Sequence, residues 1–224
     1  MQQSEANEIR FLQALSILLQ GDPERLVLID ESHKDQNAAR RRRGWGRKGN
    51  VDGVKVREWF EKVVRYTLIA AADINGFIPS ACHTVQRDEL SEEGAAGTID
   101  CEYFLHWVKE YLCPVLGNYE HGEPRSVVLM DNASTHMNDE VEYAIRSTGA
   151  ILIYSSPFSP HLNPIELFFG KYKKYLKKND RRMLVDWYNV HMEGLNVVDR
   201  DTGIKCFRKS KVPGAYSIQL TSEK

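Results

Sequence analysis

The 224-residue chain has little of what membrane, secreted and zinc-cluster proteins require. No apolar stretch approaches the roughly 18 residues that a bilayer-spanning helix needs. The opening MQQSEANEIR also lacks the basic-then-apolar layout of a signal peptide. The four cysteines are scattered and form no C-x-x-C pair, which excludes a zinc knuckle and a disulfide framework. We therefore expect a soluble protein of a reducing compartment, with no membrane partner.

Positive charge is not in excess either, because 30 Lys and Arg face 31 Asp and Glu, for a net charge of −1. The basic residues are nevertheless clustered, and clustering decides where a phosphate backbone can lie. Each cluster is either a solvated face or a nucleic-acid contact. The three clusters are Arg40, Arg41, Arg42, Arg43, Arg47 and Lys48; Lys171, Lys173, Lys174, Lys177, Lys178, Arg181 and Arg182; and Lys205, Arg208, Lys209 and Lys211.

Hydrophobic patterning predicts an α/β protein. Apolar runs at residues 25–30, 126–131 and 150–155 are typical of strands buried on both faces. Residues 63–74 and 76–85 form two further strands joined at Asn75-Gly76, a strong hairpin signal. Helical periodicity covers residues 8–20, the stretch from Asp100 to Pro114, and residues 138–147. A last helix begins at Asn163, with Pro164 in its first position.

This order of elements favours a mixed sheet of five strands with helices on both faces, as in a ribonuclease H-like fold. We expect residues 1–22 to be a helical connector, residues 23–180 to be the main domain, and residues 181–224 to be a C-terminal extension. The extension is weakly patterned, with a short helix around residues 184–192 followed by a polar tail.

Three carboxylates stand at positions suited to metal binding. Asp30 and Asp131 each follow a buried strand, and Glu166 lies in the first turn of the last helix. A two-metal site needs such oxygen ligands to converge so that the ions lie about 3.5–4 Å apart. Each residue also has a structural alternative: a strand-end aspartate often serves a turn, and Glu166 is placed to close a capping box with Asn163.

Three sequence blocks together resemble the catalytic motifs of the mariner superfamily of DDE transposases and their bacterial insertion-sequence relatives. These blocks are LVLIDES with Asp30, VVLMDNASTH with Asp131, and SPFSPHLNPIELFFGKYK with Glu166. The 34 residues between Asp131 and Glu166 (166 − 131 − 1) match the glutamate branch of that superfamily. RRRRGWGRKGN is similar to the basic block of the family.

The resemblance implies a ribonuclease H-like nuclease in which Asp30, Asp131 and Glu166 hold two Mg²⁺ or Mn²⁺ ions. Its activity would be endonuclease cleavage and strand transfer at transposon ends, with double-stranded DNA (transposon ends and target) as partner. A homodimer is expected because two ends must be paired. The location would be the nucleus in a eukaryote and otherwise the cytoplasm. Helix-turn-helix domains precede the catalytic domain in this family, so residues 1–22 are interpreted as the link to them.

Further residues are expected around the three ligands. Asn132 and Ser134 would orient Asp131, and Asn163 would support Glu166. His33, His136 and His161 lie near the motifs, either as metal or proton ligands or as loop residues.

The DNA contacts are expected from the basic clusters, where Trp45 either stacks on a base or anchors its loop. The expected DNA-contacting residues are Arg40, Arg41, Arg42, Arg43, Trp45, Arg47, Lys48, Lys171, Lys173 and Lys174.

The chain departs from the family in one motif, and two other functions compete. Ser156, Phe158 and His161 replace the usual Pro, Tyr and Asp before the glutamate. A phosphatase with a nucleophilic Asp30 is one alternative, but Ser32 stands where the second aspartate of a D-x-D motif belongs. The other is a domesticated or truncated DNA-binding protein that keeps the fold without transposition activity.

Replacing Arg40, Arg41, Arg42 and Arg43 with alanine should weaken binding to duplexes of every sequence, because phosphate contacts position DNA without reading it. The slope of log affinity against log salt concentration should flatten by about 0.9 for each phosphate that the variant no longer binds. Titration of a labelled duplex at several salt concentrations measures this. An unchanged slope would mark the run as a solvated loop or a localisation signal.

Overall fold

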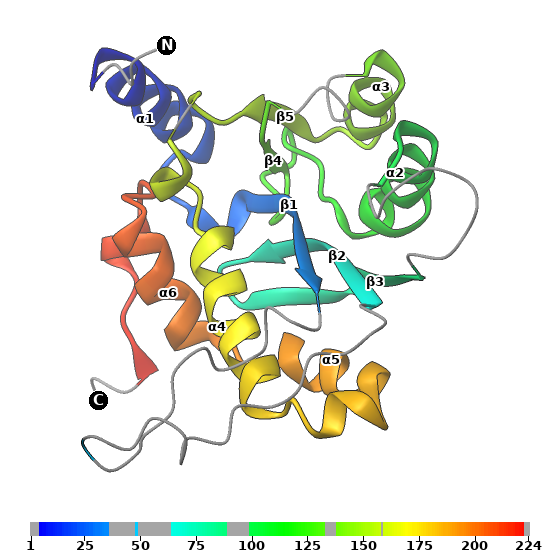
Figure 1. Ribbon diagram of the computed structural model, residues 1–224. Coiled ribbons are helices and arrows are strands. Elements are labelled where there is room, and N and C mark those ends of the chain that lie inside the picture. The colour runs from blue at the N-terminus through cyan, green and yellow to red at the C-terminus, as the bar shows by residue number, and fades with distance from the viewer. Residues whose placement is uncertain are drawn as a thin grey trace.

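The computed structural model describes residues 5–35, 48, 64–88, 99–132, 138–157 and 159–221 (Figure 1). None of the helices in these ranges is long and apolar enough to cross a membrane. The elements in chain order are α1 (Glu5–Leu19), β1 (Leu26–Asp35), β2 (Val64–Asp73), β3 (Gly76–Asp88), α2 (Cys101–Trp107), β4 (Val127–Met130), α3 (Asp139–Ser147), β5 (Ile151–Tyr154), α4 (Ile165–Lys178), α5 (Trp187–Leu195) and α6 (Arg200–Lys209).

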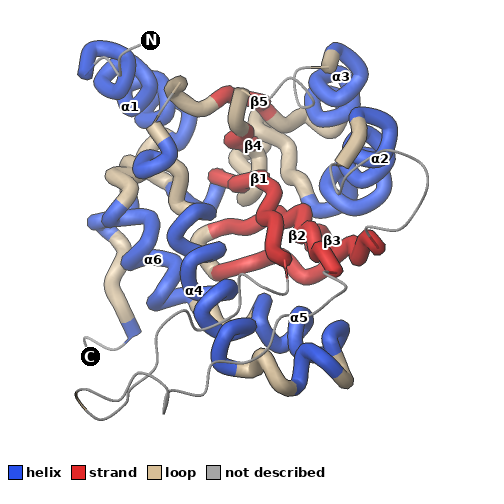
Figure 2. The backbone as a smooth tube through the Cα atoms, in the orientation of Figure 1, coloured by secondary structure: helices blue, strands red, loops and turns tan. Residues whose placement is uncertain are grey.

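The five strands form one mixed sheet, as expected from the sequence (Figure 2). Their order in the sheet is β3-β2-β1-β4-β5. The pairs β1–β2 and β2–β3 are antiparallel, whereas β1–β4 and β4–β5 are parallel. One face of the sheet packs against α1, α4, α5 and α6, and the other packs against α2 and α3. The two groups of helices lie on opposite sides of the strands in Figure 1. The result is a three-layer α/β architecture.

Strand β1 is buried on both faces, as its apolar run predicts. Leu26 and Leu28 belong to the core under α4, and Val27 and Ile29 belong to the core under α2 and α3. This alternation follows from the two-residue period of a strand. The central strand therefore contributes side chains to both hydrophobic cores.

The hairpin forms where Asn75-Gly76 predicts it, with the turn one residue earlier. Ile74 and Asn75 make the turn, and Gly76 pairs with Asp73. The backbone N–H of Asn75 donates to Asp73 Oδ1 at 2.7 Å. Gly76 has a φ of +124°, and a Cβ there would clash with the carbonyl oxygen of Val198. Glycine is needed because a C-terminal segment lies directly against the turn.

The expected polar tail is wrong, because α6 is a packed helix. Its residues Ile204, Cys206 and Phe207 join the same core as Leu28 and Phe168. At its start, Arg200 donates to Asn75 Oδ1 and, at 2.6 Å, to Glu24 Oε1. Its buried residues have helical spacing, but they are few and lie among five charged residues in RDTGIKCFRK, so the pattern is weak in the sequence and the tertiary contact decides the structure.

Two helices also differ from their expected bounds. The stretch after Asp100 is α-helical only to Trp107, and Val108–Leu112 form a wider π-helical turn before Pro114. Helix α1 begins at Glu5 and buries Leu15 and Leu19 in the core. The segment expected as a connector therefore contributes to the packing of the main domain.

Replacing Gly203 with alanine should destabilise the protein although alanine favours a helix. A Cβ at Gly203 would clash with the carbonyl oxygen of Ile74, a backbone atom that cannot give way cheaply. Overpacking of about 1–3 kcal/mol should exceed the gain of roughly 1 kcal/mol in helix propensity.

Gly170→Ala is the matched control, because a Cβ there has no neighbour within 4 Å and should stabilise the protein by up to about 1 kcal/mol. Urea unfolding measures both variants. Equal stabilisation by both would contradict the packing of α6 on the hairpin turn.

Candidate active site

The register between β1 and β4 brings Asp30 and Asp131 to the same level of the sheet. Leu26, Val27 and Leu28 pair in parallel with Val127, Val128 and Leu129. Two further residues along each strand are Asp30 and Asp131. Both share the alternation of Leu28 and Leu129, which face the core under α4. The two carboxylates therefore emerge side by side on the face that α4 covers.

Asp30 is not at the end of its strand, contrary to our expectation. Strand β1 continues to Asp35, and beyond Leu28 its ladder is with β2, where Asp30 pairs with Ala70. The parallel pairing with β4 ends at Leu28, because β4 itself ends at Met130. Asp30 thus lies just past the last rung of the β1–β4 ladder, and the Glu31 amide donates to its Oδ1 at 2.7 Å.

Glu166 approaches this position from the start of α4. Asn163 has extended backbone angles, and its side-chain oxygen accepts from the Ile165 amide at 3.3 Å, so it caps the helix as expected. The backbone N–H of Asn163 donates to the Pro160 carbonyl at 3.0 Å. In a capping box this backbone N–H would donate to the Glu166 side chain, so the capping-box alternative is wrong. The Glu166 side chain is exposed.

The three carboxylates line one open cavity of about 730 Å³. Asn132 donates from Nδ2 to the Ser155 carbonyl at 2.8 Å, which ties the loop after β4 to the loop after β5. The other lining residues come from these loops and from the approach to α4: Asn132, Ser155, Ser156, Pro157, Ser159, Pro160 and Asn163.

The three carboxylates line the same cavity, but the described residues do not form a ready-made metal site there. Within the described ranges, no three His, Cys, Asp or Glu side chains are close enough together to hold a metal ion. The convergence of Asp30, Asp131 and Glu166 on shared metal ions therefore stays a prediction. The donor chemistry still fits Mg²⁺ or Mn²⁺, because three carboxylates and the amide oxygen of Asn132 offer oxygen ligands.

The histidines have other partners. His33 Nδ1 hydrogen-bonds Thr67 Oγ1 at 2.9 Å, and its Nε2 lies 3.7 Å from Glu31. His161 Nε2 lies 3.3 Å from Glu8 Oε2, which links α1 to the segment before α4. Neither lines the cavity, so both have structural roles: His33 pairs within the sheet, and His161 lies in the turn before α4. His136 lies outside the described residues, as do Ser134 and Phe158.

Sequence reasoning missed the serines of the cavity wall. Ser156 and Ser159 are buried, and the Ser159 hydroxyl donates to Ser156 Oγ at 3.4 Å and to the Pro157 carbonyl at 3.3 Å. The available signal was the cluster of serine and proline between a strand and a helix, which is typical of a loop that carries function.

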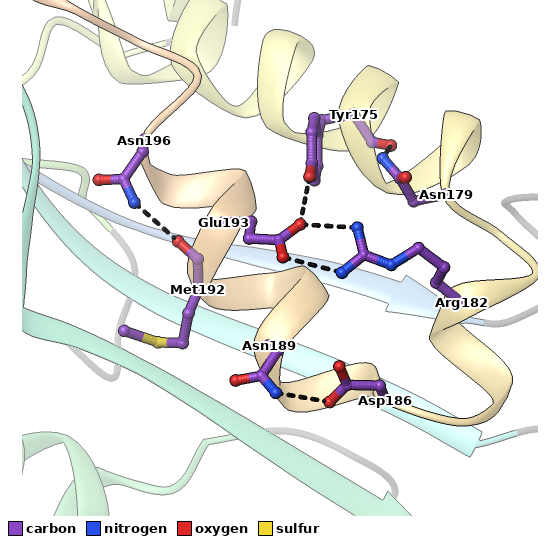
Figure 3. Close-up of polar contacts among 8 residues, drawn as sticks. All are labelled: Tyr175, Asn179, Arg182, Asp186, Asn189, Met192, Glu193 and Asn196. Carbon is purple, nitrogen blue, oxygen red and sulfur yellow. Dashed lines mark hydrogen bonds and ion pairs between the residues drawn. The ribbon is translucent and has the colours of Figure 1, made fainter.

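The expected DNA contacts fall into two groups. Lys48, Lys171, Lys173 and Lys174 are exposed, the last three along α4. Arg182 of the same cluster is instead paired with Glu193 of α5 at 2.8 Å (Figure 3). The remaining expected contacts lie outside the described residues: Arg40, Arg41, Arg42, Arg43, Trp45 and Arg47.

Comparison with known proteins identifies both a family and a fold. The family model described as DDE superfamily endonuclease matches residues 25–184. A search of the curated proteins finds no significant match. Similar solved structures include the mariner Mos1 paired-end complex with Mg (14% identity, TM-score 0.57) and the Mos1 strand transfer complex (16% identity, TM-score 0.55). The matches cover 98% and 94% of this chain but only 65% and 63% of the Mos1 chains.

At this identity the likeness concerns the fold, which is ribonuclease H-like with a mixed five-stranded sheet. This chain spans less than two thirds of the length of those Mos1 chains.

Asn163→Ala should lower the free energy of unfolding by about 1 kcal/mol, because α4 loses its side-chain cap. Asn163→Asp keeps the acceptor oxygen and should retain most of that stability. Urea unfolding of both variants tests this. No loss in the alanine variant would show that Pro164, and not the Asn163 side chain, fixes the start of α4.

Proposed function

Since the chain belongs to the DDE superfamily endonucleases, we propose that it is the catalytic domain of a transposase that cuts and joins DNA. The proposed reaction is hydrolysis of a phosphodiester at a transposon end, followed by attack of the freed 3′-hydroxyl on target DNA. Asp30, Asp131 and Glu166 would be its catalytic carboxylates. The observation that carries this proposal is their shared cavity, reached from two neighbouring strands and one helix start.

The three carboxylates would hold two divalent cations, Mg²⁺ or Mn²⁺. Mos1 paired-end complexes similar in fold to this chain contain Mg or Mn. Two such ions, when bound, stabilise the attacking and leaving oxygens of a displacement at phosphorus. Asp30 lies within β1, Asp131 directly follows β4, and Glu166 lies in the first turn of a capped helix. The chain thus supplies the three ligands from regular elements or directly beside them, which favours a defined site geometry.

Asn132 and Asn163 would position the carboxylates without touching the reacting phosphate. Asn132 fixes the loop next to Asp131 through its bond to Ser155, and Asn163 fixes the first turn that carries Glu166. Ser134 is proposed for the same role as Asn132.

Duplex DNA is the proposed partner, both as transposon end and as target. A homodimer would pair two ends, and the proposed location is the nucleus in a eukaryote and the cytoplasm otherwise. The phosphatase alternative is disfavoured, because the matched family is one of endonucleases. If the unmodified chain binds DNA but does not cleave it, the domesticated DNA-binding alternative is favoured.

Asp30→Asn, Asp131→Asn and Glu166→Gln should each abolish metal-dependent nicking of plasmid DNA. Each amide removes a charged ligand, and a loss of several kcal/mol in transition-state stabilisation corresponds to roughly a thousandfold or more in rate. The variants should stay folded, because neutralising one of several neighbouring carboxylates relieves repulsion. In the unmodified chain, added Mn²⁺ should raise the melting temperature, and the variants should lose much of that rise.

Glu31→Gln is the matched control, because Glu31 is next to Asp30 but on the opposite face of β1 and does not line the cavity. It should nick normally. A cavity variant that nicks like the control would remove that carboxylate from the site, and one that melts much lower without metal would show a structural role.

A further inference from the structure

Helix α4 presents a lysine-rich surface that continues from the cavity. Glu166 is exposed at its start, and its buried side consists of Ile165, Phe168, Phe169, Tyr172 and Leu176. Five lysines are exposed further along: Lys171, Lys173, Lys174, Lys177 and Lys178. This surface is the strongest charged feature of the described residues that the carboxylate site does not use.

Only two of these lysines share the angular position of Glu166. A helix turns about 100° per residue, so Lys173 and Lys177, seven and eleven residues on, lie within roughly 20° of Glu166 around the axis. Lys171 and Lys178 lie about 120–140° away, and Lys174 lies between. Glu166, Lys173 and Lys177 therefore form one straight stripe along the helix.

The rest of the stripe is open to a close approach. Gly170 is exposed about 40° from Glu166 around the helix axis. A Cβ at Gly170 would meet nothing within 4 Å, so no other part of the described structure covers this turn. The Lys173 Nζ lies 5.9 Å from the Phe169 ring centroid, which keeps its stem along the helix.

The ammonium groups of Lys173 and Lys177 have no acidic partner among the described residues. No described residue forms an ion pair with Lys173 or Lys177. Arg182, beyond the helix end, is instead neutralised within the protein. Its two terminal nitrogens each donate to Glu193 at 2.8 Å, and the Tyr175 hydroxyl donates to the same carboxylate at 2.5 Å (Figure 3). The uncompensated positive charge therefore begins after Glu166 and ends before Arg182.

We propose that Lys173 and Lys177 form a phosphate track that holds one strand of a DNA duplex in line with the carboxylate cavity. This inference rests on the proposed function, because it takes the phosphate to be cut as lying at Glu166. A rise of about 1.5 Å per residue puts Lys173 and Lys177 roughly 10 and 16 Å along the helix. At these distances the two lysines would lie beside phosphates of the strand that leads away from the phosphate to be cut. Lysine recognises these phosphates as a point charge and reads no sequence.

The test compares two double variants with the same change of charge. Lys173→Ala with Lys177→Ala removes the track. Lys109→Ala with Lys178→Ala is the matched control, because both lysines are exposed, Lys178 lies off the stripe, and Lys109 follows α2 on the other face of the sheet. Binding of a short labelled duplex to the full chain is measured at several salt concentrations with EDTA present, so that cleavage plays no part. Melting temperatures confirm that both variants fold.

The track variant should flatten the slope of log affinity against log salt by about 1.8, which is about 0.9 for each of two phosphates, and the control should keep the slope of the unmodified chain. Equal flattening in both variants would show a diffuse charge and overturn the track. So would an unchanged slope in the track variant, or failure of the unmodified chain to bind duplex at low salt. If the two variants give the expected slopes but the unmodified chain never nicks DNA, the proposed catalysis alone would be overturned.

Discussion

Parallel pairing between β1 and β4 is the constraint on which the candidate site depends. Only three residue pairs join the two strands, yet they fix both the level and the face at which Asp30 and Asp131 emerge. A slip of one residue would turn either carboxylate into the opposite core, between apolar side chains. The apolar residues before each aspartate are buried on both faces, which makes such a slip costly. The apolar packing that fixes the register of β1 and β4 thus also fixes the positions of Asp30 and Asp131.

Helix α4 connects this sheet to the C-terminal helices. Its aromatic side packs on the core, where Phe168 lies against Phe77 of β3 and Phe207 of α6. Its Tyr172 hydroxyl is hydrogen-bonded to His191 of α5, and burial raises the pKa of that tyrosine. Glu166 therefore lies on a helix that packs against β3, α5 and α6, although its own side chain is exposed. Residues far from the cavity thus fix the position of the helix that carries Glu166.

The sequence predicted the elements whose patterns are self-contained and missed those that depend on contacts. Long apolar runs and the Asn75-Gly76 pair identified the strands without any knowledge of the fold. The polar half of β1 carries no such pattern, because pairing with β2 alone extends the strand past Asp30. The order and spacing of the motifs predicted Asp30, Asp131 and Glu166 as site residues, and the three line one cavity. The sequence did not predict the cavity wall of Ser155, Ser156 and Ser159, because the position of a loop depends on the elements that it connects.

The contact between Gly203 and the turn at Ile74 bears on how the chain is made. These residues are 129 positions apart (203 − 74), so the contact cannot form until α6 has left the ribosome. Until then Phe77 and Phe168 lack their C-terminal cover, and the nascent sheet exposes an apolar face of the kind that chaperones bind. The family motif ends at residue 184, before α5 and α6. The unit that folds is therefore longer than the unit that carries the catalytic motifs, and the core acquires its final packing only after α6 has been synthesised.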